Sequence, residues 1–467
     1  MSSHSTFSSL DLTSALDGLH PDLRILGPEA LAGRHPGEDQ ANLNAGVMAQ
    51  PASTEAVAAL VSWCRANRVA IVPQGGVSGL VGGGVSHAGD IILSSARLNR
   101  VLAIHADEET VEVEAGVTLE ALQTALDPHG LTTGIDLGSR GSATIGGMAA
   151  TNAGGILAFR NGVMRHQILG LEAVLPSGEI FSDLTRVVKV SAGPDLKQLL
   201  IGSEGAFGFV TRLVLKVETI RPHRAVALLG VLDASRGLRV AARLRRHPAL
   251  QLEAAEMMWP RYVRDHAALK RFDLSWLENN TPVQLLEVSG ETAEAATALL
   301  EAELAEIWEE AELQGGIIAQ SSDQAHRFWE MREDSGFYFA AFPNAPSFDV
   351  SMPPSALDDY VAGLTNRLDA IGDGLEAYVY GHIADGNLHI AIAAAGPLPS
   401  ELKAAIEAAV YDGIRASGGS FSAEHGVGLE KRAAYLTHVD PVKQALARQI
   451  KSVLDPHNLF NPGKVPF

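Results

Sequence analysis

The chain has a single cysteine among its 467 residues, so no internal disulfide can form. Such scarcity is typical of proteins from reducing compartments. Cys64 lies in an apolar stretch with helical spacing, and we interpret it as a buried small hydrophobe rather than a nucleophile. No apolar run approaches the ~18 residues of a membrane span, and the N-terminus lacks the basic start and apolar core of a secretory signal. We therefore expect a cytoplasmic protein with no membrane span.

Positive charge is also scarce. Lys and Arg number 36 against 55 Asp and Glu, which gives a formal net charge of -19. This balance argues against a nucleic-acid partner or an anionic membrane surface. An anionic substrate would need local cations to overcome the repulsive background. Hydrophobic residues make up 46% of the chain, enough for a large core divided into two or three domains.

The order of elements along the chain indicates an α+β protein. Helix and strand patterns alternate from Pro51, beginning with a helix over 54–67. Strands at 101–104 and 111–115 flank a turn and predict a hairpin. The texture changes after residue 222 and again near residue 400, where the chain becomes mainly helical. Neither an internal repeat nor a low-complexity linker is evident.

Glycine numbers 46 residues, and much of it falls between residues 75 and 208, where it clusters in three loops at 74–85, 142–155 and 201–211. The first follows a short strand directly, and consecutive glycines let backbone N–H groups converge on an anion. Its spacing is neither the Rossmann nor the Walker pattern, so it favours neither a nicotinamide site nor an NTPase. A merely flexible loop is the alternative. Three such loops together favour a large, flat, anionic ligand lying against bare backbone, and residues 130–155 have few bulky side chains for a core.

Two histidines flank a turn sequence in the segment 377–393. If residues 384–387 form the turn, His382 pairs with His389 on one face of a hairpin, close enough to share a metal ion. A pair of hydrogen-bonded surface histidines is the alternative. Glu424, followed by His425, offers the carboxylate of a facial three-ligand set with positions open for substrate. A metallohydrolase could use the same ligands, but it would leave the glycine loops unexplained and HExxH is absent.

Several motifs together resemble a known family. PQGGVSGLVGG, TIGGMAATNAGG, LGLEAVLPSGE and GSEGAFGFVT resemble the FAD-binding domain of the vanillyl-alcohol-oxidase (PCMH) type. The C-terminal half resembles the D-2-hydroxy-acid dehydrogenases, which include D-lactate and D-2-hydroxyglutarate dehydrogenases. The resemblance runs from about residue 40 to the end. It implies a two-subdomain FAD-binding domain at 1–222, an interrupting α+β substrate-binding cap with an antiparallel sheet at 223–400, and a C-terminal helical segment at 401–467 that completes the flavin and active site.

The resemblance implies FAD as the cofactor. Relatives with covalent flavin carry His in or near the first glycine loop, whereas this loop reads QGGVSG, so we expect non-covalent FAD. The cofactor-binding residues predicted from the three loops and the tail are Pro73, Gly75, Gly76, Val77, Ser78, Gly79, Leu80, Gly138, Ser142, Thr144, Gly146, Gly147, Thr151, Asn152, Gly154, Gly155, Glu204, Gly205, Gly208, Val210 and Asn461.

The resemblance also assigns roles in the C-terminal half. GHxxDGNLH and AEHG imply His382, His389 and Glu424 as ligands of a divalent metal, with Zn first and Mn or Fe as alternatives. His425 is implied as the general base and a substrate contact, and Asn387 as a further substrate contact. Arg332 matches a carboxylate-binding Arg; the alternative is a surface Arg paired with Glu333 or Asp334.

The expected reaction oxidises a D-2-hydroxy acid to the 2-oxo acid by hydride transfer to flavin N5. A metal on the hydroxyl and carboxylate oxygens would lower the alcohol pKa, and a His near neutrality can accept the proton. Ser347 stands where hydroxyglutarate enzymes carry a Lys that helps to hold the acid. This departure favours a shorter or more apolar acid such as D-lactate, unless His326 or Arg327 substitutes.

Other assignments stay open at this point. The chain could be the FAD subunit of a glycolate-oxidase-like electron-transfer complex, whose iron–sulfur cluster a single Cys cannot supply. A flavoprotein aryl-alcohol oxidase is disfavoured by the metal triad. The expected partner is a small anionic 2-hydroxy acid. The electron acceptor is left open among an electron-transfer flavoprotein, a quinone and a cytochrome, and a homodimer is left open as well.

Overall fold

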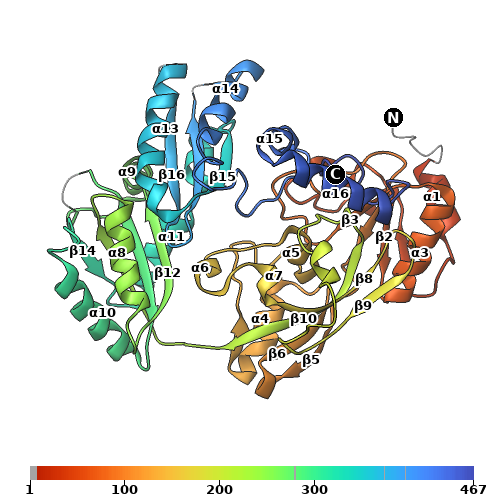
Figure 1. Ribbon diagram of the computed structural model, residues 1–467, viewed down its shortest axis with the longest axis horizontal. Helices are drawn as coiled ribbons and strands as arrows, with labels where there is room; N and C mark the ends of the chain where they lie inside the picture. Colours follow the sequence, from red (N-terminus) through yellow and green to blue (C-terminus); the bar gives the residue numbers. More distant parts are fainter. Residues whose placement is uncertain (1–7, 278–279, 373, 395) are drawn as a thin grey trace. The chain divides into compact units, whose positions relative to one another are not determined.

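The computed structural model describes residues 8–277, 280–372, 374–394 and 396–467 (Figure 1). Contacts within the chain divide it into two compact units. Unit 1 comprises Met1–Ile220 together with Glu424–Phe467, and unit 2 comprises Arg221–Ala423. Among the described residues, no helix is both long and apolar enough to cross a membrane.

Unit 1 contains a four-stranded sheet of order β1-β2-β4-β3. Its strands are β1 (Leu23–Leu26), β2 (Met48–Pro51), β3 (Ile71–Gln74) and β4 (Ile91–Ser94). Helix α3 (Thr54–Asn67) begins after Ser53, whose hydroxyl accepts a hydrogen bond from the Ala56 amide. Cys64 on this helix is fully buried and burial raises the pKa of its thiol, so the interpretation of Cys64 as a core residue is confirmed.

The second sheet of unit 1 has the order β5-β6-β10-β8-β9, and β7 also pairs with β10. The strands are β5 (Val101–His105), β6 (Thr110–Glu114), β7 (Leu131–Thr133), β8 (Ile168–Val174), β9 (Ile180–Asp183) and β10 (Phe209–Thr219). β5 and β6 form the predicted hairpin. Helix α4 (Leu119–Leu126) follows β6 and buries Leu119, Leu122 and Leu126.

The expectation that residues 130–155 contribute little to a core is wrong. Helix α5 (Ile145–Thr151) lies within that segment, and its Ile145, Met148 and Ala149 are buried in the core of unit 1. Small residues serve close packing here. A Cβ added at Gly146 would lie 2.5 Å from the Cβ of Ala115, so only Gly lets α5 approach β6 this closely.

The C-terminal tail closes the first sheet of unit 1. After α16 (Pro441–Leu454), Phe460 forms a parallel bridge with Ile71, the first residue of β3. Asp455 fixes the approach because its carboxylate accepts hydrogen bonds from the amides of Leu459 and Phe460, each at 2.8 Å. Lys451 Nζ donates to the same carboxylate and to the carbonyl of Phe460.

Lys464 lies beyond this bridge and is 1% exposed, and its buried Nζ has no hydrogen-bond partner among the described residues. Burial lowers its pKa from 10.5 to about 8, although the negative charge of Asp90 partly raises it again. Between pH 8 and 10.5 the unfolded chain therefore binds a proton that the folded chain does not, so the free energy of unfolding rises with pH, by about 3 kcal/mol in total.

Replacing Lys464 by Met removes this penalty, so we expect a higher Tm at pH 7 and loss of the rise in stability between pH 8 and 10.5. Chemical denaturation across that pH range measures both effects. Lys443→Met, at an exposed position of α16, is the control and leaves the rise in place. A lower Tm for Lys464→Met at pH 7 would contradict the assignment.

Unit 2 is built on a seven-stranded sheet of order β14-β11-β13-β12-β16-β17-β15. Every neighbouring pair in it is antiparallel. The strands are β11 (Arg224–Gly230), β12 (Gln251–Met258), β13 (Val283–Ser289), β14 (Gly316–Ile318), β15 (Ser347–Ser351), β16 (Glu376–His382) and β17 (Asn387–Ala393). The antiparallel sheet expected for a cap over this part of the chain is present.

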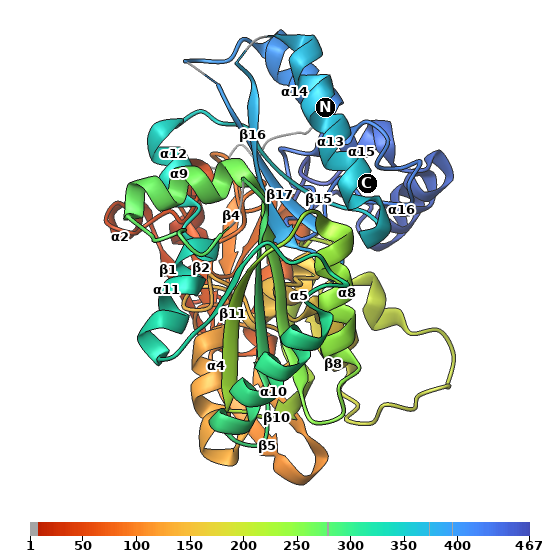
Figure 2. The same ribbon diagram turned by 90° about the vertical axis from the view of Figure 1, so that its left-hand side faces the viewer.

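Helices pack on both faces of this sheet (Figure 2). α8 (Ala234–Arg245), α10 (Ala293–Ile307) and α13 (Leu357–Ile371) lie together on one face. α9 (Pro260–Lys270) and α11 (Ser322–Glu333) cover the other. An aromatic core fills the space beneath α9 and α11, with Tyr262 and Phe328 packed against Tyr380 and Tyr378 of β16.

The predicted boundary at residue 400 is not where the structure divides. Helix α14 (Ser400–Tyr411) packs against α13 of unit 2, where Tyr360 Oη donates to the Val410 carbonyl at 2.7 Å and Arg367 Nε donates to the Ala409 carbonyl at 2.7 Å. Ser420 then forms an antiparallel bridge with Ser351. Residues 401–423 thus belong to unit 2. Hydrogen bonds to a distant helix fix them there, whereas the change to a mainly helical sequence does not mark the boundary.

Candidate functional site

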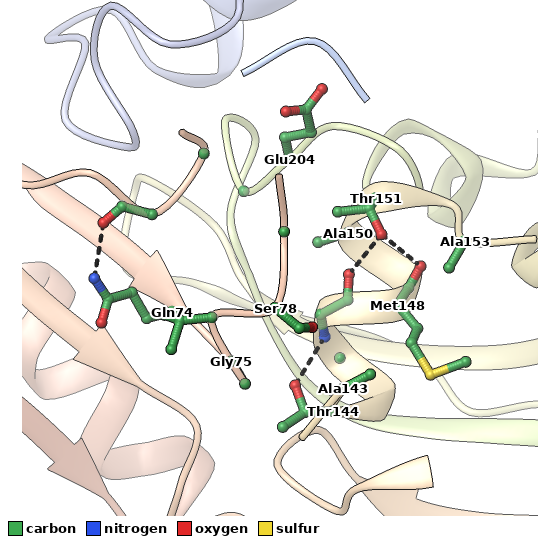
Figure 3. Close-up of a pocket in the computed structure, with 18 of the residues that line it drawn as sticks. Gln74, Gly75, Ser78, Ala143, Thr144, Met148, Ala150, Thr151, Ala153 and Glu204 are labelled. Carbon is green, nitrogen blue, oxygen red and sulfur yellow. Dashed lines mark hydrogen bonds between the residues drawn. The ribbon is translucent and has the colours of Figure 1, made fainter. Parts of the chain in front are cut away.

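Unit 1 contains a cavity of about 470 Å³ whose wall is formed by the three glycine-rich loops (Figure 3). All but four of the predicted cofactor residues line it. The lining members are Pro73, Gly75, Gly76, Val77, Ser78, Gly79, Leu80, Gly138, Thr144, Gly146, Gly147, Thr151, Gly154, Glu204, Gly205, Gly208 and Val210. A cavity of this size is in the range of cofactor sites.

The glycines are required where the loops touch one another. A Cβ at Gly75 would lie 2.2 Å from Thr144 Oγ1, and one at Gly76 would lie 1.7 Å from the Ser142 carbonyl oxygen. Gly205 has a φ of +74° and would place a Cβ 2.9 Å from the ring of Pro73. Where the loops meet, the wall is therefore bare backbone, which fits a large, flat cofactor such as FAD.

Four predicted cofactor residues do not line the cavity, and each has a supporting contact instead. Ser142 donates to the Ser139 carbonyl, and the side chain of Asn152 accepts from the Arg165 amide. The Gly155 amide donates to Glu424. Asn461 Nδ2 donates to the carbonyls of Gly83 and Glu204, so it links the first and third glycine loops without lining the cavity itself.

The cavity also includes residues that the sequence did not point to, among them Glu38 and Asn42. The Glu38 amide donates to the Val77 carbonyl at 3.2 Å, and Val77 has a φ of +47°, a conformation that is costly for a β-branched residue. These N-terminal residues are far from the glycine loops in sequence and carry no motif. No local signal could have placed them here.

Glu204 has a structural role that its motif did not reveal. Its carboxylate accepts hydrogen bonds from the amides of Val427 and Gly428, at 2.7 and 2.8 Å. Burial raises the pKa of this carboxyl group, and the two amides oppose the shift. Glu204 thereby anchors the segment that directly follows Glu424 and His425, and both of these residues also line the cavity.

The predicted register of the histidine hairpin is wrong. His382 pairs with Asn387, and His389 pairs with Tyr380, so the loop comprises residues 383–386. Gly386 decides this because its φ is +80° and a Cβ there would lie 1.8 Å from the Met352 carbonyl oxygen. The shift changes the pairing by two residues, which keeps both histidines on one face. Their ring centroids lie 5.5 Å apart.

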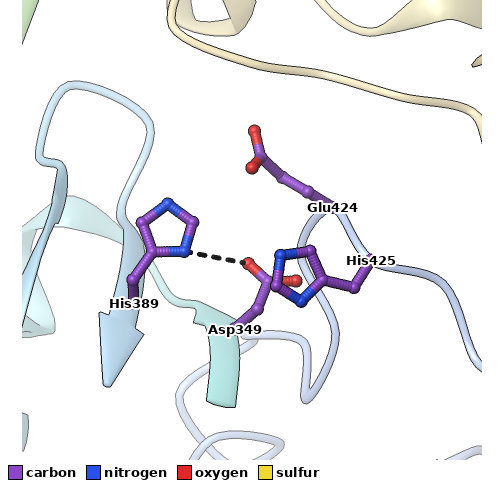
Figure 4. Close-up of side chains that lie close together, drawn as sticks. All are labelled: Asp349, His389, Glu424 and His425. Atoms are coloured by element: carbon purple, nitrogen blue, oxygen red, sulfur yellow. Dashed lines mark ion pairs between the residues drawn. The ribbon is translucent and has the colours of Figure 1, made fainter. Parts of the chain in front are cut away.

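Asp349 of β15 is a site residue that sequence reasoning missed. It is fully buried, and its Oδ1 accepts from Asn387 Nδ2 at 2.9 Å and lies 3.9 Å from His389 Nδ1 (Figure 4). Its Oδ2 accepts from the Ala423 amide at 3.0 Å. Ala423 is the last residue of unit 2, and Glu424 follows it directly. Asp349 thus holds the last residue of unit 2 in place.

Asn387 is buried and held by two hydrogen bonds from its Nδ2, to Asp349 and to the Val350 carbonyl. These bonds define the amide orientation, which leaves its Oδ1 as the acceptor. That oxygen is buried with no hydrogen-bond partner among the described residues. A buried acceptor of this kind is costly unless it meets a donor. A substrate donor could supply the missing partner of this Oδ1, which is compatible with the prediction that Asn387 contacts a substrate.

Glu256 of β12 joins two of the predicted site residues. It is 1% exposed; its Oε1 lies 2.7 Å from His382 Nδ1, and its Oε2 accepts from Arg332 Nε and Nη2 at 2.7 and 2.6 Å. Burial by itself would raise the pKa of Glu256, but the charges of His382 and Arg332 outweigh it, and the pKa lies below its ordinary value.

Arg332 is 7% exposed and lies over the Tyr380 ring, with its Cζ 4.8 Å from the ring centroid. The alternative of a surface Arg paired with Glu333 or Asp334 is therefore wrong. Its position is fixed further by Tyr262, whose hydroxyl donates to the Arg332 carbonyl. The helix α11 that carries Arg332 thus delivers a buried guanidinium to the sheet face on which His382 and His389 lie.

Comparisons with solved structures first show the class of fold to which the chain belongs. The fold resembles that of p-cresol methylhydroxylase with substrate bound, at 14% identity and a TM-score of 0.71, over 95% of this chain and 93% of that one. It also resembles a 4-ethylphenol oxidase from Gulosibacter chungangensis, at 19% identity and a TM-score of 0.67, over 94% and 93%. The α+β fold predicted from the sequence, with an FAD-binding domain of the vanillyl-alcohol-oxidase type, is confirmed.

The family follows from the sequence models and relatives. Residues 45–183 match the FAD binding domain, and residues 220–465 match the C-terminal domain of FAD linked oxidases. A D-2-hydroxyglutarate dehydrogenase from Xanthomonas citri pv. viticola is 36% identical over 427 residues, covering 90% of this chain and 88% of the relative. A probable mitochondrial D-2-hydroxyglutarate dehydrogenase from Oryza sativa subsp. japonica is 35% identical, covering 89% and 74%. A putative mitochondrial D-lactate dehydrogenase from Schizosaccharomyces pombe is 32% identical, covering 89% and 80%.

The chain belongs to the FAD-linked oxidase family, in the branch of these dehydrogenases. It is an FAD-linked oxidoreductase, as the resemblance of the sequence implied.

Proposed function

We propose that the protein is an FAD-dependent dehydrogenase that oxidises a D-2-hydroxy acid to the 2-oxo acid with the help of a divalent metal. The names of the relatives, D-2-hydroxyglutarate and D-lactate dehydrogenases, support the substrate class. The observation that carries the proposal is the set of buried polar groups on one face of the unit 2 sheet. His382, His389 and Arg332 are each fixed there by a buried carboxylate or an aromatic ring.

The donor set fits a metal. His382 and His389 share one face, and the Glu256 carboxylate directs His382 Nδ1–H toward itself, which makes Nε2 the nitrogen with the lone pair. Glu424 is the third proposed ligand, and Asp349 adds a carboxylate beside His389. Two imidazoles and a carboxylate suit Zn²⁺ first, with Mn²⁺ or Fe²⁺ as alternatives. A bound metal would supply Lewis acidity that favours loss of the hydroxyl proton.

Substrate binding and proton transfer are assigned to residues of this chain. Arg332 binds the substrate carboxylate, and Asn387 contacts the substrate. His425 accepts the proton of the substrate C2 hydroxyl. His425 also lines the glycine-loop cavity of unit 1, which supports a role beside the cofactor. FAD held by the cavity would supply the hydride acceptor for the hydrogen on C2. The first glycine loop contains no His, Cys or Tyr, which supports non-covalent FAD.

Anaerobic bleaching of the bound flavin tests the proposal. Paired D- and L-2-hydroxy acids are added with and without a chelator, and the visible flavin absorbance is followed. Bleaching by D-acids only, lost on chelation and restored by Zn²⁺ or Mn²⁺, is the expected result. A yellow protein that no 2-hydroxy acid bleaches would overturn the substrate class. Bleaching that survives complete metal removal would overturn the role of the metal.

The contact between Glu256 and His382 gives a further prediction. In Glu256→Gln the amide keeps the shape, but His382 loses its charged partner, so we expect metal affinity to fall about 10- to 100-fold. Metal titration of the apoprotein measures the change. Glu253→Gln is the matched control, because Glu253 is an equally buried carboxylate on the same strand that accepts from Ser289 Oγ. Equal losses in the two variants would mean that general destabilisation of β12 is responsible.

A further inference from the structure

Two buried side chains in the wall of the glycine-loop cavity each present an oxygen that no described residue binds. They are Asn42, on the short helix η1 (Gln40–Leu43), and Ser95, which directly follows β4. Asn42 is 3% exposed and Ser95 is 4% exposed. Asn42 Oδ1 and Ser95 Oγ both lack a hydrogen-bond partner among the residues that the structure describes. A buried polar atom in this state is costly, so such a pair in a cavity wall favours a site where a ligand supplies the missing contacts.

The orientation of the Asn42 amide is set by its other contacts. Its Nδ2 donates to the Pro36 carbonyl at 2.9 Å, so the oxygen is the end that faces away from Pro36. The backbone amide of Asn42 donates to the Asp39 carbonyl. Its backbone carbonyl accepts from Gln74 Nε2 at 2.7 Å and from Ser86 Oγ at 3.0 Å. Within the described part of the chain, Oδ1 is therefore the polar atom of Asn42 that is left for a ligand.

Both side chains lie at the carboxyl ends of the parallel strands β3 and β4. Gln74 is the last residue of β3, and its carbonyl accepts from the Ser95 amide at 3.1 Å while its Nε2 holds Asn42. Gln74 Nε2 also donates to the carbonyl of Gly84, at the far end of the first glycine loop. A Cβ at Gly84 would lie 3.1 Å from Asn42 Oδ1, so the bare backbone there leaves this oxygen uncovered.

The chemistry of these atoms selects the part of the cofactor that they can meet. A side-chain amide oxygen only accepts hydrogen bonds, whereas a hydroxyl both accepts and donates. Phosphate oxygens also only accept, so Asn42 Oδ1 cannot hold the pyrophosphate of FAD. Glu38, another lining residue of the same segment, adds a carboxylate that repels phosphate as well. Residues 38–42 therefore suit a neutral part of the cofactor that carries N–H or O–H groups.

We propose that Asn42 and Ser95 form a subsite of the cavity, in which Asn42 Oδ1 accepts a hydrogen bond from an N–H or O–H group of bound FAD and Ser95 Oγ makes a second contact. The groups of FAD with this chemistry are the adenine amine, the N3–H of the isoalloxazine ring and the sugar hydroxyls. The inference rests on the FAD cofactor of the proposed function and is independent of its substrate and its metal. Neither residue belongs to the set predicted from the glycine loops and the tail.

Titration of FAD into the apoprotein, followed by flavin fluorescence, tests the subsite without a measurement of turnover. Asn42→Leu removes the acceptor at similar volume, and we expect the Kd for FAD to rise about 10- to 100-fold because a cofactor donor loses its partner. Ser95→Ala is expected to raise the Kd about three- to tenfold. Asn67→Leu is the matched control and should bind as the wild type does, since Asn67 is exposed on α3 and its Nδ2 also donates to a backbone carbonyl, that of Trp63.

Asn42→Asp separates a contact with the cofactor from a structural role. This substitution keeps an oxygen at the position of Oδ1 but loses the hydrogen bond to Pro36, as Asn42→Leu does. We therefore expect Asn42→Asp to bind FAD at least about tenfold more tightly than Asn42→Leu. Equal losses in the two variants would mean that the contact with Pro36 is responsible, and they would overturn the inference.

Flavin mononucleotide, which lacks the AMP half of FAD, identifies the donor. A loss in Asn42→Leu that is equally large for both flavins places the donor on the riboflavin half, and a loss confined to FAD places it on the AMP half; either result supports the subsite. A wild-type protein that binds FAD with an affinity that neither Asn42→Leu nor Ser95→Ala changes overturns the inference and leaves the proposed function intact. A wild-type protein that binds neither flavin overturns both.

Discussion

Gly76→Ala is expected to yield a folded protein that retains little FAD. The added Cβ would lie 1.7 Å from the Ser142 carbonyl oxygen and 2.5 Å from its carbon. Both are backbone atoms, so no side-chain rotation can relieve the overlap, and the first and second glycine loops must move apart. Overpacking of this kind costs about 1–3 kcal/mol or more, which corresponds to roughly a 10- to 100-fold loss of FAD affinity if the cost falls on the bound geometry.

The measurement is the ratio of flavin to protein absorbance after desalting, followed by titration of FAD into the apoprotein. Gly33→Ala is the control, because a Cβ there meets nothing within 4 Å and Gly33 does not line the cavity. It should keep the flavin. If both variants lose FAD equally, the cause would be general destabilisation, and the collision at Ser142 would be the wrong explanation. Circular dichroism checks that each variant folds.

His389→Ala is expected to lower turnover of a D-2-hydroxy acid about 1000-fold while FAD stays bound. The ring of His389 sits between two fixed neighbours, Asp349 at 3.9 Å and the Tyr380 ring at 5.1 Å, so its position is set by the sheet. Removing a proposed metal ligand would remove Lewis-acid stabilisation worth several kcal/mol, and about 1.4 kcal/mol corresponds to a tenfold change in rate.

Three measurements separate a metal effect from a folding defect in this variant. Metal content per chain should fall, flavin content should not, and thermal unfolding should change little. Chelation of the wild type should reproduce the loss of turnover. His223→Ala, at an exposed position of unit 2, serves as the histidine control. Full activity of His389→Ala in metal-free buffer would show that this imidazole does not hold a catalytic ion.

Local sequence patterns predicted most of the residues that line the cavity of unit 1. The glycine loops were recognisable because runs of Gly next to a strand have a local meaning, namely close backbone approach, and the cavity is indeed lined by those loops. The histidine face was also predictable although the register was not. Strand alternation has a period of two, so an error of two residues in pairing left His382 and His389 on the same side.

Long-range pairing supplied what no local pattern contains. Glu256 and His382 are 126 residues apart, and Asp349 and Asn387 are 38 apart. Each contact exists because particular strands are neighbours in the seven-stranded sheet. In the sequence QLEAAEMM, Glu256 is only an interruption of an apolar strand pattern. Nothing in that pattern indicates which residue it pairs with. For the same reason the sequence did not predict the pairing of Arg332 with Glu256, and its alternative of a surface Arg paired with Glu333 or Asp334 was wrong.

The sequence by itself determined the fold family and the glycine-rich loops that line the cavity of unit 1, because these depend on short motifs whose backbone requirements are local. The tertiary structure decided which carboxylates lie beside the histidines, which unit residues 401–423 join, and which side chains share one sheet face across four strands. Those outcomes depend on hydrogen bonds and packing between segments far apart in the chain, and their free energy is gained only when the sheet has formed.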